Sequence, residues 1–199
     1  MHNPYQAPTS DLAGANPAPS EDGLQPAGFW RRVGAHLVDT LIMLPVVGFT
    51  YWGATVSRHF YAWWIVPSVL LGLFYSVYLV RRYGGTPGKL AMKLRIQMAD
   101  GAPVTVKAAF LRAVVIQALA LTTTAGMALA ALAMNDADYL SLGFMARSEM
   151  LSNTGPAWMN VGTILMQVWI WGSLVVLLAN KRRRAPHDFL AGTALVGKQ

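Results

Sequence analysis

Four long stretches with almost no charged residues are the strongest constraint on what this chain can fold into. Within them, the only acidic residue is Asp39 and the only histidines are His36 and His59. The stretches lie between Arg32 and Arg58 (25 residues), between Arg58 and Arg81 (22), over 113–135 (23) and between Glu149 and Lys181 (31). About 20 helical residues cross a hydrocarbon core about 30 Å thick. The sequence therefore predicts four transmembrane helices, at about 33–56, 60–80, 110–134 and 157–179.

The composition agrees with a lipid environment. Of the 199 residues, 54% are hydrophobic and 13% are charged, against about 25% charged residues in a typical soluble domain. The chain has no cysteine, which excludes disulfides, thiol catalysis and cysteine-ligated metals. We expect an all-α, polytopic membrane protein.

The basic residues predict the topology. With four helices, 14 of the 16 lysines and arginines fall on one side of the membrane, and only Arg58 and Arg147 fall on the other. Such residues accumulate on the cytoplasmic side of short loops. Both termini are therefore expected in the cytoplasm, and an odd number of helices would separate the basic clusters.

The segments outside the helices have distinct compositions. Residues 1–28 are rich in proline, alanine and serine and predict a disordered cytoplasmic tail, in which NPYQAP is a candidate docking motif. The transmembrane domain would occupy 29–199 and end in a short surface segment, 185–199. In the long inner loop, KLAMKLRI has the spacing of an amphipathic helix, and Asp100-Gly101 allows a hairpin over 95–106.

Asp39 is the acidic residue that needs explaining, because a carboxylate near the centre of a membrane helix costs about 2.5–3.5 kcal/mol. Arg32, His36 and Asp39 are spaced i, i+4 and i+7, so they share one helix stripe. Two interpretations remain open. Either Asp39 binds a cation or proton in exchange, or it is the permanent partner of a basic group, for which Arg112 is the obvious choice.

Three segments resemble the RDD family of bacterial membrane proteins, in family order. They are GFWRRVGAHLVDTLIML (28–44), GGTPGKLAMKLRIQMADGAPVTVKAAFLR (84–112) and RRAPHDFLAGTALV (183–196). The arginine and the two aspartates that name the family map onto Arg32, Asp39 and Asp188. The other matching positions are Gly84, Thr86, Gly88, Lys89, Asp100, Gly101, Arg112, His187 and Thr193. His36 is outside the pattern, and about 122–156 looks like an addition.

The resemblance implies a location in the bacterial cytoplasmic (inner) membrane and transport of unknown ligands, with cation/proton antiport suggested for some members. We expect Asp188 to pair with Arg32, Lys89 or Arg112 and so to gather the matched charges into one cluster. The ion- or ligand-linked residues would be Asp39, Arg32, Arg112, Asp188, His187, Lys89 and Thr86. The GGTPGK segment is either a tight turn or an anion site, and it lacks P-loop spacing.

No enzyme motif and no metal-ligand spacing occur in the sequence, so we expect neither catalysis nor a metal nor a cofactor. Because every basic block flanks a predicted helix, anionic lipid headgroups are better partners than nucleic acid for Lys181, Arg182, Arg183 and Arg184. The leading hypothesis is transport of a small solute or cation/proton exchange through Asp39, which in so small a protein allows a homo-oligomer. The alternative is a non-transporting accessory or scaffold protein whose charge cluster is structural.

Overall fold

Four long apolar helices dominate the computed structural model, which describes residues 25–180 and 184–197. The first is α1 (Phe29–Val56), the third α5 (Val106–Ala133) and the fourth α8 (Ala157–Ala179). The second begins as α2 (Phe60–Leu73), continues as a π-helical segment, η2 (Phe74–Tyr78), and ends as α3 (Leu79–Tyr83). All four are long and apolar enough to cross a membrane. The predicted polytopic all-α fold is confirmed.

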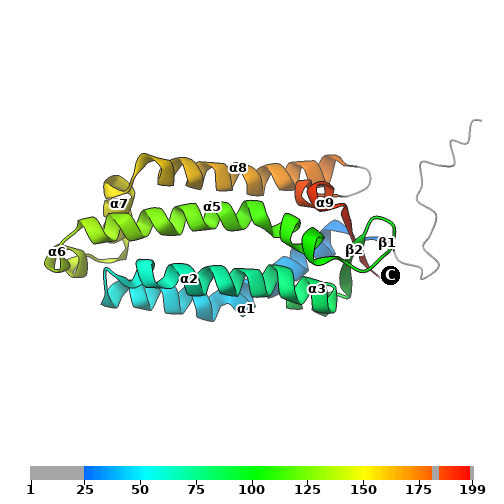
Figure 1. The fold of residues 1–199 in the computed structure, drawn as a ribbon, viewed down its shortest axis with the longest axis horizontal. Coiled ribbons are helices and arrows are strands. Elements are labelled where there is room, and N and C mark those ends of the chain that lie inside the picture. Colours follow the sequence, from blue (N-terminus) through cyan, green and yellow to red (C-terminus); the bar gives the residue numbers. More distant parts are fainter. Residues whose placement is uncertain (1–24, 181–183, 198–199) are drawn as a thin grey trace, which may run out of the picture.

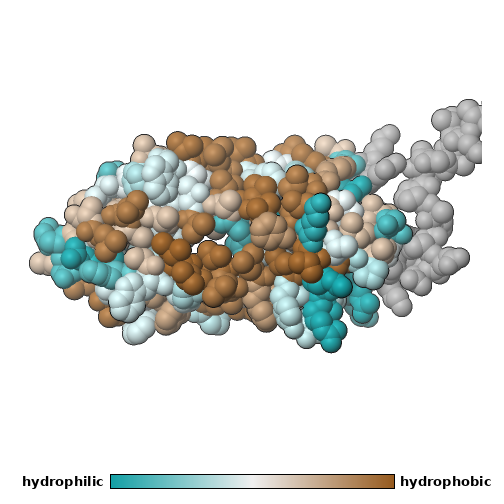
Figure 2. Space-filling view, in the orientation of Figure 1, coloured by the Kyte–Doolittle hydropathy of each residue, from teal (hydrophilic) through white to brown (hydrophobic). Residues whose placement is uncertain are grey.

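The helices lie side by side, with α5 packed between α2 and α8 and with α1 next to α2 and the short helix α4 (Pro87–Ala91) (Figure 1). Only 6% to 22% of the residues in their most apolar windows are buried. Apolar side chains cover the middle of the molecule, whereas hydrophilic ones gather at both ends (Figure 2). Such an outward-facing apolar surface is stable in a bilayer but would be costly in water.

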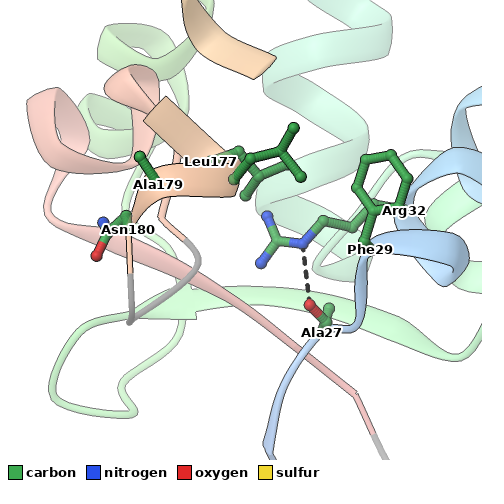
Figure 3. Close-up of a pocket in the computed structure, with 7 residues that line it drawn as sticks. Ala27, Phe29, Arg32, Leu177, Ala179 and Asn180 are labelled. Atoms are coloured by element: carbon green, nitrogen blue, oxygen red, sulfur yellow. Dashed lines mark hydrogen bonds between the residues drawn. The ribbon is translucent and has the colours of Figure 1, made fainter. Parts of the chain in front are cut away.

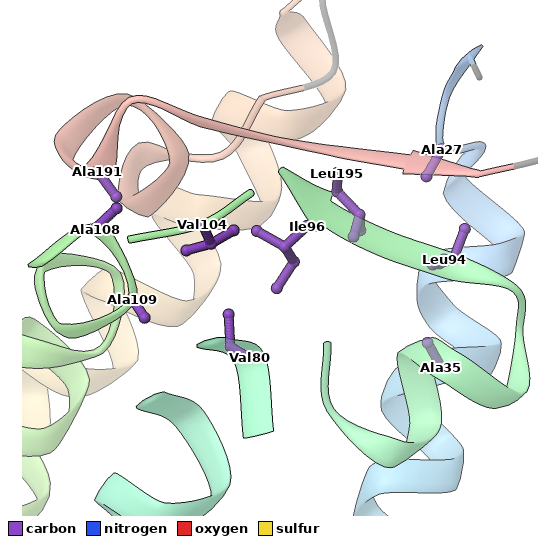
Figure 4. Close-up of a cluster of buried hydrophobic side chains, with 10 residues drawn as sticks. All are labelled: Ala27, Ala35, Val80, Leu94, Ile96, Val104, Ala108, Ala109, Ala191 and Leu195. Carbon is purple, nitrogen blue, oxygen red and sulfur yellow. The ribbon is translucent and has the colours of Figure 1, made fainter. Parts of the chain in front are cut away.

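Buried side chains form two clusters, one at each end of the helices. The larger one lies beneath a three-stranded antiparallel sheet, where Leu94, Ile96 and Leu195 pack against the start of α5 and the end of α3 (Figure 4). The sheet contains β1 (Gln25–Pro26), β2 (Leu94–Met98) and β3 (Thr193–Gly197) in the order β1-β3-β2. We call this end, where α1 begins and α8 ends, the basic end.

The opposite end is closed by two short helices, α6 (Asp136–Ser141) and α7 (Phe144–Thr154). Tyr139 is fully buried there and donates a hydrogen bond to the carbonyl of Ala54 at 2.9 Å. The Arg147 guanidinium lies 5.0 Å from the Tyr139 ring. The segment that looked like an addition therefore folds back onto the end of α1.

Three local expectations for the basic end need correction. The turn at Asp100-Gly101 forms, and the Met98 amide donates to the Ala102 carbonyl across it at 2.9 Å. Otherwise β2 pairs with β3, so the expected hairpin over 95–106 is reduced to this turn. The amphipathic helix is limited to α4, because Lys93 adopts φ 55° and Leu94 starts the strand. Residues 25–28 were placed in the tail, yet β1 pairs with β3 and Ala27 is buried. Residues 1–24, which include NPYQAP, lie outside the described residues.

Candidate functional site

Asp39 lies at the basic end, where donors from the second span and from α4 converge on its carboxylate. Oδ1 accepts hydrogen bonds from the Tyr75 hydroxyl at 2.5 Å and from the Gly88 amide at 2.7 Å. Oδ2 accepts one from the Thr86 hydroxyl at 2.6 Å and lies 3.9 Å from Lys89 Nζ. We call these five residues the Asp39 site. Its carboxylate side chain is only 13% exposed.

The local sequence explains how these donors reach Asp39. The π-helical segment η2 contains Tyr75, and such segments change the direction in which side chains leave a helix. Thr86 precedes Pro87, which starts α4, so Thr86 is buried at the helix entry. Gly88 lets α4 approach α1 closely: a Cβ there would lie 2.1 Å from the Ala35 carbonyl oxygen and 2.7 Å from the Asp39 carboxyl. The GGTPGK segment therefore serves as a turn that supplies a backbone donor.

A second group of polar residues surrounds Asp188, in the short helix α9 (Pro186–Ala191) that follows the fourth span. Arg112 Nη1, from the first turns of α5, forms an ion pair with Asp188 Oδ1 and donates to Thr193 Oγ1 at 2.8 Å. The Ala185 amide donates to Asp188 Oδ2 at 3.0 Å. Arg184 donates to the carbonyls of Thr193 and Asp188 at 3.0 and 3.3 Å. Together with His187, these residues form the Asp188 site.

The Asp188 site is strongly desolvated. Asp188 and Thr193 are fully buried, and the Arg112 side chain is 9% exposed. Burial alone would raise the pKa of Asp188, but the charge of Arg112, the neighbouring His187 and the hydrogen bonds from Ala185 and Arg112 together outweigh it, and the pKa lies below its usual value. Burial and the Arg112 charge lower the pKa of His187 to about 4. His187 is therefore neutral at neutral pH.

The two sites lie within electrostatic reach of each other. The charges that act on His187 include Arg112, Asp188, Lys89 and Arg32, and Lys89 also lies beside Asp39. Arg32 itself donates from Nε to the Ala27 carbonyl at 3.2 Å and from Nη2 to the Leu195 carbonyl at 3.5 Å. The charged residues selected from the sequence are thus neighbours at one end of the bundle.

Some expected contacts do not form. Arg112 pairs with Asp188 and not with Asp39, because α9 lies against α5 while α4 lies against α1. His36 is exposed and does not extend a polar stripe from Arg32 to Asp39. The sequence did not predict Tyr75, because it is one of several hydroxyl-bearing residues in the second span and no motif distinguishes it from the others. Arg184 was predicted only as a lipid contact. Lys181, Arg182 and Arg183 lie outside the described residues.

The buried carboxylate of Asp188 and the largely buried one of Asp39 lie with their donors at one end of four lipid-facing helices. They define a polytopic membrane protein with a charged site near one membrane surface. Among the described residues, no group of three or more histidine and acidic side chains is placed to hold a metal ion.

The chain belongs to the RDD family, whose pattern it matches over residues 26–192. It is 33% identical over 112 residues to the uncharacterized protein YckC of Bacillus subtilis (strain 168), a match that covers 54% of this chain and 69% of that protein. No solved structure matches.

Proposed function

We propose that this RDD protein is a non-transporting membrane accessory or scaffold protein in which the charge cluster is structural. The observation that carries the proposal is the number of donors that surround Asp39. A carboxylate offers about four lone-pair positions, and Asp39 faces three hydrogen-bond donors and one ammonium group. Each donor comes from a segment other than α1, so the carboxylate holds three parts of the chain together.

The same geometry disfavours an exchangeable ion at Asp39. Oδ1 already accepts two hydrogen bonds, so a metal cation would bind at the side of Oδ2 that faces Lys89 and would stand beside the Lys89 ammonium. Binding of a cation next to a like charge is unfavourable. This argument supports a permanent role for Asp39, and the proposal assigns the protein no catalytic activity.

Cation/proton exchange, or movement of another small solute, remains the second candidate because of one observation. Lys89 Nζ lies 3.9 Å from Asp39 Oδ2, which is too far for a hydrogen bond, and the Asp39 side chain is 13% exposed. Movement of Lys89 away from Asp39 would leave a carboxylate with a route to the membrane surface. In this case several copies of the chain would be needed to enclose a path.

The topology and the partners belong to the same proposal. We place the basic end in the cytoplasm and the protein in the bacterial inner membrane, because lysine and arginine gather at that end. The basic residues around the end of α8, including Arg184, would attract anionic headgroups at about 1 kcal/mol each. Nucleic acid is not among the proposed partners.

A flux assay with a stability control separates the two candidates. The full chain is reconstituted into proteoliposomes that contain a pH-sensitive dye, and Na⁺, K⁺ or proton gradients are applied to wild type and Asp39→Asn. The structural role predicts no flux above that of empty vesicles. It also predicts a lower melting temperature for Asp39→Asn, because the amide nitrogen of the asparagine would face the donors around position 39 in either orientation of the side chain. Glu149→Gln is the control, because Glu149 is exposed in α7 and its loss of charge should leave the melting temperature unchanged.

Proton-coupled cation flux in wild type that disappears in a normally stable Asp39→Asn variant would overturn the structural proposal.

A further inference from the structure

A cavity of about 410 Å³ opens at the basic end between the start of α1 and the end of α8 (Figure 3). Its size falls within the range of about 300–1,000 Å³ that is usual for ligand pockets. Arg32 extends from α1 toward the end of α8, where Leu177 and Asn180 line the opposite wall (Figure 3). The cavity belongs to neither the Asp39 site nor the Asp188 site.

The cavity has a cationic and an apolar part. The polar side chains are the Arg32 guanidinium and the Asn180 amide, and none of the described lining residues is acidic. Hydrogen bonds to the Ala27 and Leu195 carbonyls hold the Arg32 side chain in place. A guanidinium group fits phosphate oxygens well because it offers several N–H donors in one plane. The cavity therefore has the charge and the geometry for a phosphate group.

The apolar part continues onto the lipid-facing surface of α8. Leu178 lines the cavity and is 61% exposed. Val175 and Trp171, which are 63% and 62% exposed, precede it at the spacing of one helix face. Since α8 is a membrane span, acyl chains cover this face. An occupant that reaches from the Arg32 guanidinium to Trp171 needs a negative head and an apolar tail.

We propose that the cavity is a binding site for an anionic phospholipid of the leaflet at the basic end. The lipid phosphate contacts Arg32 and Asn180, and one acyl chain lies along Leu178, Val175 and Trp171. This is a defined site with one lipid, and it differs from the general attraction of anionic lipid to basic residues beside a membrane. The proposal does not depend on whether the protein transports an ion.

The test measures lipid binding to the purified full chain in detergent. Phosphatidylglycerol and phosphatidylcholine with identical acyl chains are titrated separately, and retained lipid is counted by native mass spectrometry. Two variants alter the cavity: Arg32→Gln removes the cation, and Leu177→Trp fills the space while keeping Arg32. The matched controls are Arg82→Gln, an exposed arginine at the same end, and Leu165→Trp, a half-exposed leucine farther along α8.

The expected result is retention of one phosphatidylglycerol at a concentration about tenfold lower than phosphatidylcholine, as one charge-assisted contact predicts. Both cavity variants should lose this preference about tenfold, and both controls should stay within about twofold of wild type. If Arg32→Gln does not fold, Leu177→Trp alone decides. Equal retention of the two lipids, an unaffected Leu177→Trp variant, or glycerol phosphate binding as tightly as the whole lipid would overturn the proposal.

Discussion

Gly88→Ala tests whether close approach of α4 to α1 holds the basic end together. The new Cβ would lie 2.1 Å from the Ala35 carbonyl oxygen and 2.7 Å from the Asp39 carboxyl, so α4 must move away from α1. Such overpacking costs about 1–3 kcal/mol. Lengthening the hydrogen bond from the Gly88 amide to Asp39 costs about 1.5–3 kcal/mol more. The better helix propensity of alanine returns about 1 kcal/mol, which leaves a net loss of about 1.5–5 kcal/mol.

The assay is thermal unfolding in detergent, followed by the loss of the monodisperse peak in size-exclusion chromatography. In a chain of this length, about 2–4 °C per kcal/mol is expected, so the melting temperature of Gly88→Ala should fall by about 3–20 °C. Gly48→Ala is the matched control, because a Cβ at position 48 of α1 has nothing within 4 Å. A melting temperature of Gly88→Ala within 2 °C of wild type would refute the reasoning, because 2 °C corresponds to roughly 1 kcal/mol.

Three further predictions concern the carboxylates and their neighbours. Asp188→Asn should cost about 3–5 kcal/mol, measured as the same melting shift, because Arg112 would keep a buried charge without its counterion; a shift below 2 °C, roughly 1 kcal/mol, would contradict this. Stability should fall as the pH drops from about 6.5 toward 4, because His187 has a pKa of about 4 in the folded protein and 6.5 in the unfolded chain, so only the unfolded state takes up the proton in this range. The lowered pKa of Asp188 adds a loss of stability at still lower pH. In His187→Gln, the melting temperature should depend less on pH between 7.5 and 4.5 than it does in wild type. Tyr75→Phe should cost about 1.5–3 kcal/mol through the lost hydrogen bond to the Asp39 carboxylate, whereas Tyr78→Phe, at an exposed neighbouring residue, should melt like wild type.

The four spans could be predicted from the sequence because bilayer thickness imposes a length that only long uncharged stretches satisfy. The positions of the helix ends are less well determined. α5 begins at Val106, four residues before the predicted start at 110, because the Thr105 hydroxyl accepts a hydrogen bond from the Ala108 amide and caps the helix. Such a cap depends on a single side chain and changes little in the overall hydropathy.

The sheet and the ion pairs could not be predicted in the same way. β2 and β3 are five residues each and are separated by the third and fourth spans, so no local turn connects them. The same separation explains why Arg112 was assigned to Asp39. Both lie near the basic end, and only the packing of α9 against α5 brings Asp188 to the guanidinium.

The positions that carry the family resemblance connect segments that the membrane alone would not hold together. The spans have little buried surface between them, and lipid solvates their apolar faces equally well whether they are together or apart. Association therefore needs contacts that lipid cannot replace. At the basic end, Asp39 joins α1 to α4 and the second span, and Asp188 joins the chain after the fourth span to α5. Since these contacts account for Asp39, Thr86, Gly88, Arg112, Asp188 and Thr193, assembly of the basic end is a sufficient explanation for that part of the RDD pattern.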